Sequence, residues 1–374
     1  MRILIVGDLF VSDQYYDNDL IDKSIQDMFS SADYRIVNLE APITEDNPKN
    51  KIIKTGPHLR MSSDTIMPYL HQLKIDAVTM ANNHILDYGD KGVTDTFKEL
   101  DNHKIKYIGA GNDLTEARKP LSLHKDGLKI AILNFCENEW SIAEEDSPGA
   151  NPMDIIDNTN QIREAKASHD KVIVIVHGGH EYYNLPSPRM QKQYRFYADQ
   201  GADIVVGHHT HCISGNEVYN GVPIYYSLGN FLFTKNNIND EWYTGLILEV
   251  EITSEGIDCQ IHSVRQEKES FELSFLKDID KEEVLGRFKT YSNVINNPDE
   301  LLNNWKMYIE KQSKEYLNYW SPLSFINNRY VAGLFRRLGI NFFNKKGSSL
   351  YLNLMRCEAH RDLSFGILKK QIKL

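Results

Sequence analysis

Residues 201–215, with the sequence GADIVVGHHTHCISG, contain a short apolar run that ends in three closely spaced histidines. The apolar run at 204–206 is typical of a strand that is buried on both faces. His209 and His211 stand at alternate positions, so in an extended segment their side chains face the same way. This stretch alone is compatible with a polar turn or with a metal site, and the ends of the other expected strands decide between the two.

Similar apolar runs recur along the chain, and each is followed by a turn rich in Gly, Asn or His. These runs are RILIVGD, YRIVNLEAP, DAVTMANNH, KIAILNFCENE and KVIVIVHGGHE. Stretches with the apolar spacing of helices lie between them, at about 19–29, 63–73, 91–103, 154–167 and 187–200. This alternation of strands and helices predicts a layered α/β fold with parallel strand pairing.

The sequence changes in character after residue 211. Asn220-Gly221 lies between two strand-like runs and predicts a hairpin. A second hairpin is expected to turn around residues 254–256. We therefore expect mixed β-sheets flanked by helices in a first domain at 1–267, followed by a charged helical region at 268–374.

The charge of the chain is unevenly distributed. Its 374 residues are 41% hydrophobic, enough for a sizeable core, and carry a formal net charge of −10, which disfavours a general nucleic-acid binder. Residues 321–374 contain ten Lys or Arg and two acidic residues, a net +8, so the remainder carries −18. Apolar residues such as Phe335 and Leu338 are interleaved with these basic residues. A solvated basic helical cap and docking on an acidic membrane surface or partner both stay open.

The sequence also gives an expectation about the compartment. The apolar run at residues 3–6 is too short for a signal-peptide core or a membrane span. The four cysteines are scattered without a CxxC pair, which favours free thiols in a reducing compartment. We expect a cytoplasmic protein, and peripheral association with the inner face of the membrane through the basic region stays open.

Carboxylate, amide and imidazole side chains follow the expected strands, where ligands bind in α/β sheets. They are Asp8, Asn38, Glu40, Asn82, Asn83, His84, His177, His180, Glu181, His208, His209 and His211. Each has an ordinary structural explanation when taken alone. Burying all of them is costly unless they are paired or bound to a metal, so together they predict a metal centre. The mixed oxygen and nitrogen donors suit one or two ions of Mn, Fe or Zn rather than Ca or Mg.

Six ordered motifs carry a family resemblance. They are GD at 7–8, NLEAPIT at 38–44, ANNHILDYG at 81–89, HGGHEY at 177–182, GHHTH at 207–211 and YSLGNF at 226–231. This pattern resembles the bacterial capsule-synthesis CapA family, which is associated with poly-γ-glutamate capsules. That family is similar in fold to the calcineurin-like metallophosphoesterases, and the resemblance covers roughly residues 1–250.

The resemblance implies a role for each matching residue. The implied metal ligands are Asp8 and His211 for a first ion, Asn83, His177 and His209 for a second, and Glu40 as the carboxylate between them. His84 would protonate the leaving oxygen or stabilise the transition state. The residues implied to support the site or to face the substrate are Asn38, His180, Glu181 and Asn230. For Asn38 and Asn230, a purely structural role in a turn stays open.

The sequence departs from the superfamily pattern at Phe10. Metallophosphoesterases usually carry Asp-x-His in the first motif, and Phe10 stands at the histidine position. The first ion would therefore have one ligand fewer. Many relatives also carry an N-terminal membrane anchor that we do not find here, so secretion or surface anchoring is not expected from the resemblance.

Two functions stay open on these grounds. The first is a metal-dependent, phosphoesterase-like hydrolase that acts on a capsule or envelope polymer precursor in capsule, poly-γ-glutamate or exopolysaccharide biosynthesis. The second is a non-catalytic, metal-containing assembly factor for a membrane-bound polymer synthase or exporter, engaged through the basic C-terminal region. A nucleic-acid phosphodiesterase is disfavoured because the catalytic part of the sequence is acidic.

Overall fold

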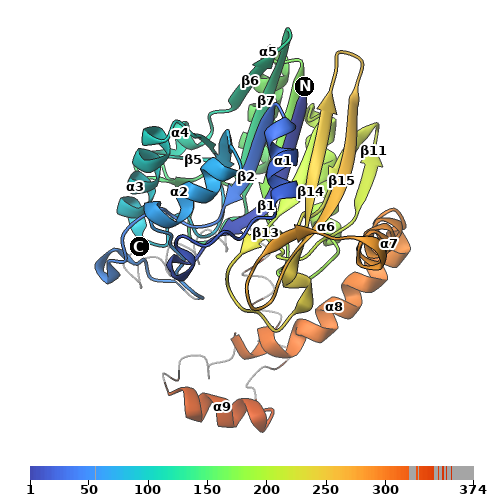
Figure 1. Ribbon diagram of the computed structural model, residues 1–374. Helices are drawn as coiled ribbons and strands as arrows, with labels where there is room; N and C mark the ends of the chain where they lie inside the picture. Colours follow the sequence, from blue (N-terminus) through green and yellow to red (C-terminus); the bar gives the residue numbers. More distant parts are fainter. Residues whose placement is uncertain are drawn as a thin grey trace. The chain divides into compact units, whose positions relative to one another are not determined.

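The computed structural model describes residues 1–54 and 56–319, residue 326, residues 328–340, and the single residues 344, 348, 351 and 355. The chain divides into two compact units, Met1–Leu301 and Leu302–Leu374. The first unit contains the sheets and the predicted site (Figure 1). The basic residues predicted between Lys345 and Lys373 lie outside the described residues.

The first sheet has eight strands in the order β16-β15-β14-β1-β2-β3-β4, with β13 also paired to β1. Strand β1 pairs in parallel with β2 and β13, and antiparallel with β14. The strands are β1 (Arg2–Phe10), β2 (Tyr34–Leu39), β3 (Ala77–Thr79), β4 (Lys106–Ile108), β13 (Asn230–Phe233), β14 (Thr244–Ile252), β15 (Ile257–Gln266) and β16 (Leu273–Phe275). The sheet is therefore mixed, with its parallel part around β1.

The second sheet has six strands in the order β11-β12-β10-β9-β7-β6. Strands β7, β9, β10 and β12 are parallel, whereas β6 and β11 pair antiparallel at the edges. Its strands are β6 (Leu121–Lys125), β7 (Leu128–Cys136), β9 (Lys171–His177), β10 (Ile204–His208), β11 (Asn216–Tyr219) and β12 (Val222–Tyr225). The predicted hairpin is present: Asn220 and Gly221 join β11 to β12 with φ angles of 51° and 83°. Strands β5 (Ala110–Gly111) and β8 (Gly149–Ala150) form a separate pair.

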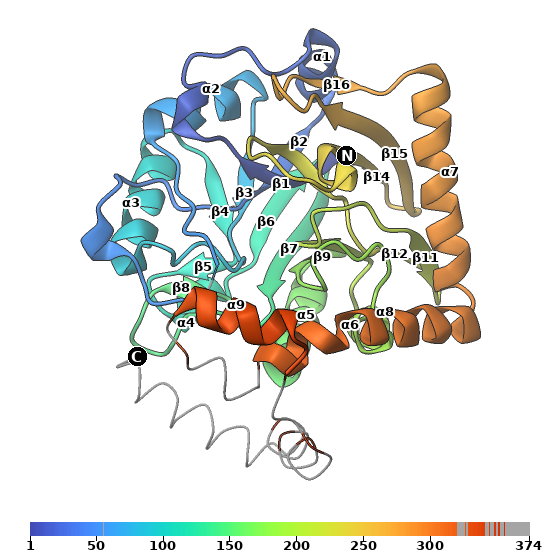
Figure 2. The same ribbon diagram turned by 90° about the horizontal axis from the view of Figure 1, so that it is seen from below.

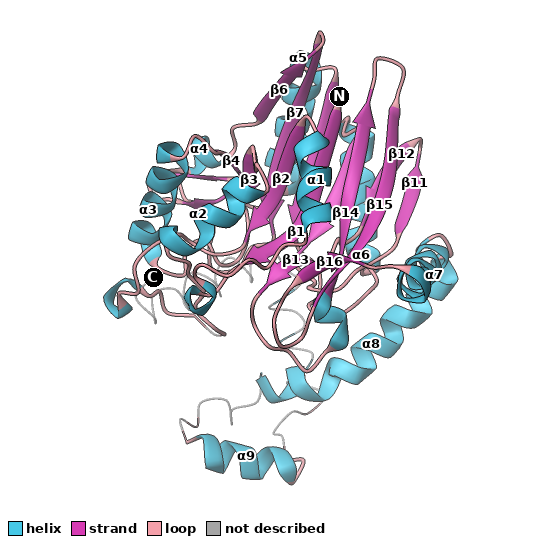
Figure 3. Cartoon of the chain, in the orientation of Figure 1, coloured by secondary structure: helices cyan, strands magenta, loops and turns pink. Residues whose placement is uncertain are grey.

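The two sheets pack face to face, and helices cover their outer faces (Figures 2 and 3). Apolar side chains such as Ile5 of β1 and Ile175 of β9 share the core between the sheets. The helices on the first sheet are α1 (Lys23–Ser31), α2 (Ser63–Gln72) and α3 (Gly89–Asn102), and those on the second are α5 (Ile155–Ser168) and α6 (Pro188–Gln200). The short α4 spans Leu114–Ala117.

The layered α/β fold with mixed sheets and flanking helices is confirmed, and the five helices predicted by periodicity are present. Their ends differ by a few residues. Helix α1 begins at Lys23 rather than at residue 19, because the Asp22 side chain accepts a hydrogen bond from the backbone N–H of Ser24 and caps the helix there.

The described part of the C-terminal region is helical, as the sequence predicts, apart from β16. It contains α7 (Asp278–Ile295), α8 (Pro298–Tyr319) and α9 (Arg329–Arg337). Helix α7 belongs to the first unit, where Ser292 Oγ accepts a hydrogen bond from the Asn216 backbone N–H at 3.0 Å. The first compact unit is thus longer than the predicted domain at 1–267. Among the residues that the structure describes, no helix combines the length and the apolar character needed to cross a membrane.

Candidate metal centre

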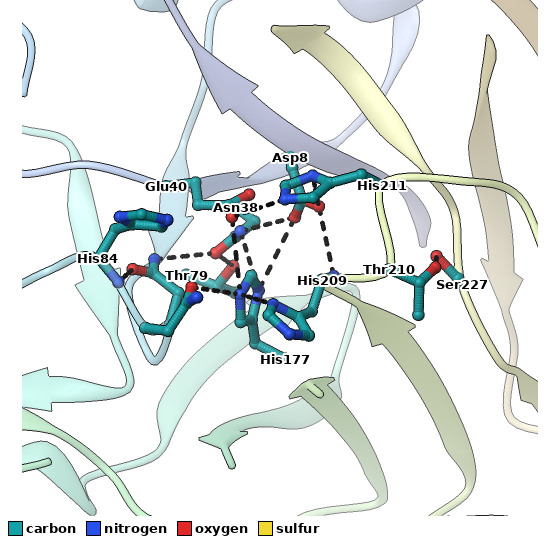
Figure 4. Close-up of polar contacts among 12 residues, drawn as sticks. Asp8, Asn38, Glu40, Thr79, His84, His177, His209, Thr210, His211 and Ser227 are labelled. Carbon is teal, nitrogen blue, oxygen red and sulfur yellow. Dashed lines mark hydrogen bonds and ion pairs between the residues drawn. The ribbon is translucent and has the colours of Figure 1, made fainter. Parts of the chain in front are cut away.

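The predicted site residues converge where the carboxyl ends of the central strands of both sheets meet (Figure 4). The first sheet contributes residues at or just after the ends of β1, β2 and β3, and the second contributes residues at the end of β9 and just after β10. From the first sheet these are Asp8, Asn38, Glu40, Asn83 and His84, and from the second they are His177, His209 and His211.

The backbone at the site is unusually close-packed. A Cβ atom on Gly7 would lie 1.8 Å from the Gly229 carbonyl oxygen, so glycine is required where β1 passes the turn before β13. His209 and His211 have φ angles of 92° and 54°, which non-glycine residues rarely adopt and which cost on the order of 1–3 kcal/mol each. The His209 backbone N–H donates to Asp8 Oδ2 at 3.3 Å, and the Thr210 hydroxyl between the two histidines lies 2.9 Å from Ser227 Oγ. Tertiary contacts therefore hold the histidine turn in a strained conformation.

Glu40 is a fully buried carboxylate, and among the residues that the structure describes neither of its oxygens has a hydrogen-bond partner. Its Oε1 lies 3.5 Å from His211 Nε2 and 3.8 Å from His177 Nε2. Burial, and then the negative charge of Asp8, raise the pKa of Glu40 well above its usual range. A buried carboxylate without partners is strongly unfavourable unless a cation compensates it. The position of Glu40 among imidazole nitrogens is what a shared metal ligand requires.

Asp8 is equally buried but well satisfied. Its Oδ1 accepts a hydrogen bond from Asn38 Nδ2 at 2.7 Å, and its Oδ2 accepts one from the His209 backbone N–H at 3.3 Å. Burial acts to raise the pKa of Asp8, but the hydrogen bond to His211 and the charges of nearby histidines outweigh it, so the pKa is lowered. Asp8 is therefore held as a carboxylate, the form that binds a metal.

The donor atoms fall into two overlapping groups. Glu40, His177 and His209 form one, and Asp8, Glu40 and His211 form the other, with the donor atoms of each group within 4.8 Å of one another. In the first group, His177 Nε2 lies 3.0 Å from His209 Nδ1 and 3.1 Å from Asn83 Oδ1. Two donors bound to one ion at about 2.1 Å lie roughly 3 Å apart. The spacing and chemistry of the donors therefore fit divalent ions, with Glu40 common to both groups.

His177 is held in the form suited to metal binding, whereas in the metal-free site burial is outweighed by the hydrogen bond and charge of Asp8, which raise the pKa of His211. Burial, and then the charge of His209, lower the pKa of His177 well below its usual range, and neutral imidazole is the ligand form. His211 Nδ1 lies 2.9 Å from Asn230 Oδ1, while Asn230 Nδ2 donates to the Trp242 carbonyl at 3.0 Å. Asn230 therefore accepts from the Nδ1–H of His211, which leaves Nε2, the atom facing Glu40, free to bind.

Asn38 orients Asp8 rather than joining either donor group. Its Oδ1 lies 3.3 Å from both the Thr79 hydroxyl and Asn82 Nδ2, which donate to it. This fixes the amide so that Nδ2 points at Asp8. Both asparagines for which a structural role stayed open, Asn38 and Asn230, thus contact a candidate ligand directly.

Two residues that the sequence analysis did not single out, Asp87 and Lys54, contact His84. His84 Nδ1 lies 2.7 Å from Asp87 Oδ2 and 3.2 Å from Lys54 Nζ. Lys54 and Asp87 form an ion pair whose side chains are 2% and 0% exposed. Burial, opposed by Asp87, lowers the pKa of His84. Asp87 could have been found from its place three residues after His84 in ANNHILDYG, but no local pattern links Lys54 to this site.

The rim of the site contains less constrained residues. Glu139, which follows β7 and was not predicted, has Oε1 at 3.7 Å from His209 Nε2 and a side chain that is 35% exposed. Glu181 is exposed, and its charge contributes to the raised pKa of Glu40. His180 is partly buried beside it. Phe10 is buried against Phe233, with ring centroids 5.0 Å apart, so an aromatic contact occupies this position and supplies no metal ligand.

Fold and site together describe a layered α/β protein with a candidate divalent-metal centre at the strand ends. The family model for the bacterial capsule synthesis protein PGA_cap matches residues 2–235, and the chain belongs to this family. The resemblance to CapA proteins inferred from the motifs is thereby confirmed.

Three curated relatives illustrate the family. The PGA biosynthesis protein CapA of Bacillus subtilis is 37% identical over 218 residues, covering 58% of this chain and 57% of the relative. The capsule biosynthesis protein CapA of Bacillus anthracis is 32% identical over 225 residues, covering 58% and 54%. A probable polyglutamine synthesis accessory protein of Mycobacterium tuberculosis is 31% identical over 215 residues, covering 54% and 56%. The chain thus matches a little more than half the length of each relative.

Solved structures give more distant similarities. A hypothetical protein from Thermus thermophilus aligns with a TM-score of 0.44 and 14% identity, covering 70% of this chain and 99% of that chain. Vps29 of Chaetomium thermophilum aligns with a TM-score of 0.33 and 10% identity, covering 74% and 95%.

Proposed function

We propose that this protein is a metal-dependent, phosphoesterase-like hydrolase that acts in the biosynthesis of a capsule polymer, either poly-γ-glutamate or an exopolysaccharide. The observation that carries the proposal is Glu40, a buried carboxylate that has no hydrogen-bond partner in the described part of the chain and belongs to both histidine-containing donor groups. The printed names of the relatives, which refer to PGA, capsule and polyglutamine synthesis, support the choice of polymer.

The donor set fits one or two ions of Mn, Fe or Zn, because it mixes carboxylate oxygens with imidazole nitrogens. Asp8, Glu40 and His211 would hold one ion, and Glu40, Asn83, His177 and His209 the other. Such ions, when bound, polarise a phosphoryl or carbonyl oxygen and lower the pKa of water towards neutrality. Binding and orientation then depend on the surrounding amides, which fix Asp8 and His211.

His84 is the residue of this chain that we propose moves a proton. Its Nδ1 is held by Asp87, so Nε2 is the atom available to a substrate. As a general acid, protonated His84 would donate the proton on its Nε2 to the leaving oxygen. Glu181 and His180, at the rim of the site, would meet the polymer precursor.

The first experiment is elemental analysis of protein purified without a chelator, comparing wild type with His209→Ala. We expect about one or two ions per chain in the wild type and a clear loss in the variant. His124→Ala, which changes an exposed histidine of the same unit, is the matched control and should keep the wild-type metal content. A wild-type protein that holds no metal and takes up none from added Mn, Fe or Zn would overturn the proposal.

The alternative function is a non-catalytic, metal-containing assembly factor for a membrane-bound polymer synthase or exporter. Phe10 favours it, because its ring packs on Phe233 and supplies no donor to the group of Asp8, Glu40 and His211. The two functions differ in their dependence on His84. The assembly role is supported by two results together. The metal-loaded wild-type protein would hydrolyse neither a chromogenic phosphodiester nor a polymer fragment, and the His84→Ala variant would capture membrane proteins as well as the wild type does.

A further inference from the structure

Helix α9 is strongly amphipathic, and its apolar side is exposed. The helix spans Arg329–Arg337 and begins at Asn328, whose side chain accepts a hydrogen bond from the Tyr330 backbone N–H at 3.0 Å. Apolar residues recur at helical spacing, and Tyr330, Leu334 and the C-cap Leu338 are 73%, 57% and 63% exposed. Exposure of such an apolar stripe to water is unfavourable. The stripe is therefore suited to burial against another surface.

The opposite side of α9 is basic. Arg329 and Arg336 lie about 20° apart around the helix, at 100° per residue, and face away from the apolar stripe, whereas Arg337 lies at the edge of the stripe, about 20° from Tyr330. Arg329 also donates from Nη2 to the Tyr330 hydroxyl at 2.9 Å, and its guanidinium lies 4.9 Å from the centre of that ring. This contact places a cation at the edge of the apolar stripe, as in helices that lie in a membrane interface.

The sequence around α9 is also positively charged over a long range. No Asp or Glu occurs from residue 321 to residue 357, and the net charge of 321–374 is +8 from ten basic and two acidic residues. The rest of the chain carries −18 and would be repelled by an anionic surface. Charge complementarity therefore selects anionic lipid headgroups as the occupant of this face, with the apolar stripe buried among the acyl chains.

We propose that α9 docks the protein on an anionic lipid bilayer, lying in the plane of the interface with Tyr330, Leu334 and Leu338 inserted. Arg336 and Arg337 extend along the surface so that their guanidinium groups reach the phosphates. A short helix of this kind binds reversibly, because the buried apolar area is small. The proposal is independent of the candidate metal centre and of the reaction proposed for it.

The test is co-sedimentation of the full chain with lipid vesicles. Vesicles of phosphatidylcholine with roughly one third phosphatidylglycerol are compared with vesicles of phosphatidylcholine alone, at low and high salt. We expect at least about tenfold tighter binding to the anionic vesicles, weakened by salt. Addition of a chelator should leave this binding unchanged, which separates it from the proposed function.

Three variants identify the surface. Leu334→Asp removes the centre of the apolar stripe, and the double variant Arg336→Glu with Arg337→Glu reverses the charge; each is expected to weaken binding about tenfold or more. Gly333→Ala, on the basic side where an added Cβ meets none of the described residues within 4 Å, should bind at least as well as wild type.

The matched charge control changes two exposed lysines of the first unit, Lys98→Glu with Lys192→Glu, and should leave binding unchanged. Thermal unfolding of every variant is expected to match wild type, because the substituted side chains are exposed. Equal sedimentation with both vesicle types, or wild-type binding by Leu334→Asp, would overturn the proposal. Sedimentation with neither vesicle type would also overturn it and would direct the search to an acidic protein partner.

Discussion

The two sheets bring different chemistry to the same site. The first sheet supplies candidate oxygen donors, namely Asp8, Glu40 and Asn83, and the second supplies candidate nitrogen donors, namely His177, His209 and His211. Within each sheet the donors oppose one another: the charge of Asp8 raises the pKa of Glu40, and the charge of His209 lowers the pKa of His177. Asp8 is hydrogen-bonded by Asn38 of its own sheet, but Glu40 is not compensated within the first sheet, and its compensation comes from the other sheet or from a bound cation.

This comparison explains why the packing of the sheets matters for function. The core between them contains Ile3 and Ile5 of β1 and Ile173 and Ile175 of β9. Burial of these side chains stabilises the face-to-face arrangement, and the same arrangement brings the carboxyl ends of β1 and β9 together. The energy of the apolar core thus holds in place a polar cluster that is unfavourable by itself.

The largest expected effect is that of removing the shared oxygen donor. Glu40→Gln is expected to abolish binding of both ions and reduce hydrolysis to background, because Glu40 belongs to both donor groups. His209→Ala and His211→Ala should each lose mainly the ion of their own group. Elemental analysis of the three variants, with His124→Ala as control, measures this difference. Equal residual metal in all three would contradict a shared role for Glu40.

The second largest effect is expected at His84, which is not one of the proposed metal ligands. His84→Ala is expected to reduce turnover about 10²–10⁴-fold while metal content stays at the wild-type level. Steady-state kinetics and elemental analysis on the same preparations provide the measurement. Loss of metal in proportion to activity would show that His84 acts as a ligand instead.

The pH dependence of the same reaction tests whether His84 acts as the general acid. Burial, opposed by Asp87, lowers the pKa of His84 below its ordinary value of 6.5. A residue that acts as an acid loses its proton as the pH rises through its pKa, so the activity limb due to His84 should decrease with rising pH at a pH below 6.5. His84→Ala should lack this limb, and a profile unchanged by the substitution argues against proton donation.

A smaller effect is expected from a residue that only orients a nitrogen donor. Asn230→Ala removes the acceptor that fixes the Nδ1–H tautomer of His211, and it should weaken metal affinity about 10–100-fold. Competition with a chromogenic chelator gives the affinity. Asn112→Ala, which changes an exposed asparagine far along the chain, is the control. An affinity equal to wild type in Asn230→Ala would mean that His211 is oriented by Asp8 alone.

Most of the fold and the members of the site could be predicted because they depend on local patterns. Apolar runs ending in polar residues marked β1, β2, β9 and β10, and Asn220-Gly221 marked a hairpin. The pairing of β13 with β1 could not be predicted, since this short strand is defined by a partner distant in sequence. Strand β16 has three residues, which is too short to show the alternation of a strand. The roles of the site residues as ligands stay predictions, although their convergence is observed.

The supporting residues were harder to predict for the same reason. Lys54 reaches Asp87 from a loop 33 positions earlier, and Glu139 reaches His209 from a loop 70 positions earlier in the chain. Neither belongs to a periodic segment, so only the tertiary structure connects them to the site. The sequence identifies groups that end strands, whereas the loops that complete the site depend on how the chain packs.

The smallest effect is a change in how stability depends on pH. In metal-free protein, the raised pKa of Glu40 means that the folded state keeps this proton to a higher pH than the unfolded chain, whose pKa is near 4.5. The folded state then binds more protons above that pH, so the free energy of unfolding falls as pH rises through the pKa of the folded state. Glu40→Gln removes this contribution, and its metal-free stability should fall less over the same window. Denaturant unfolding at a series of pH values, with a chelator present, measures both slopes. Parallel slopes for wild type and Glu40→Gln would show that the Glu40 carboxylate is compensated within the protein itself, and would remove the main argument for a cation at the meeting point of the two sheets.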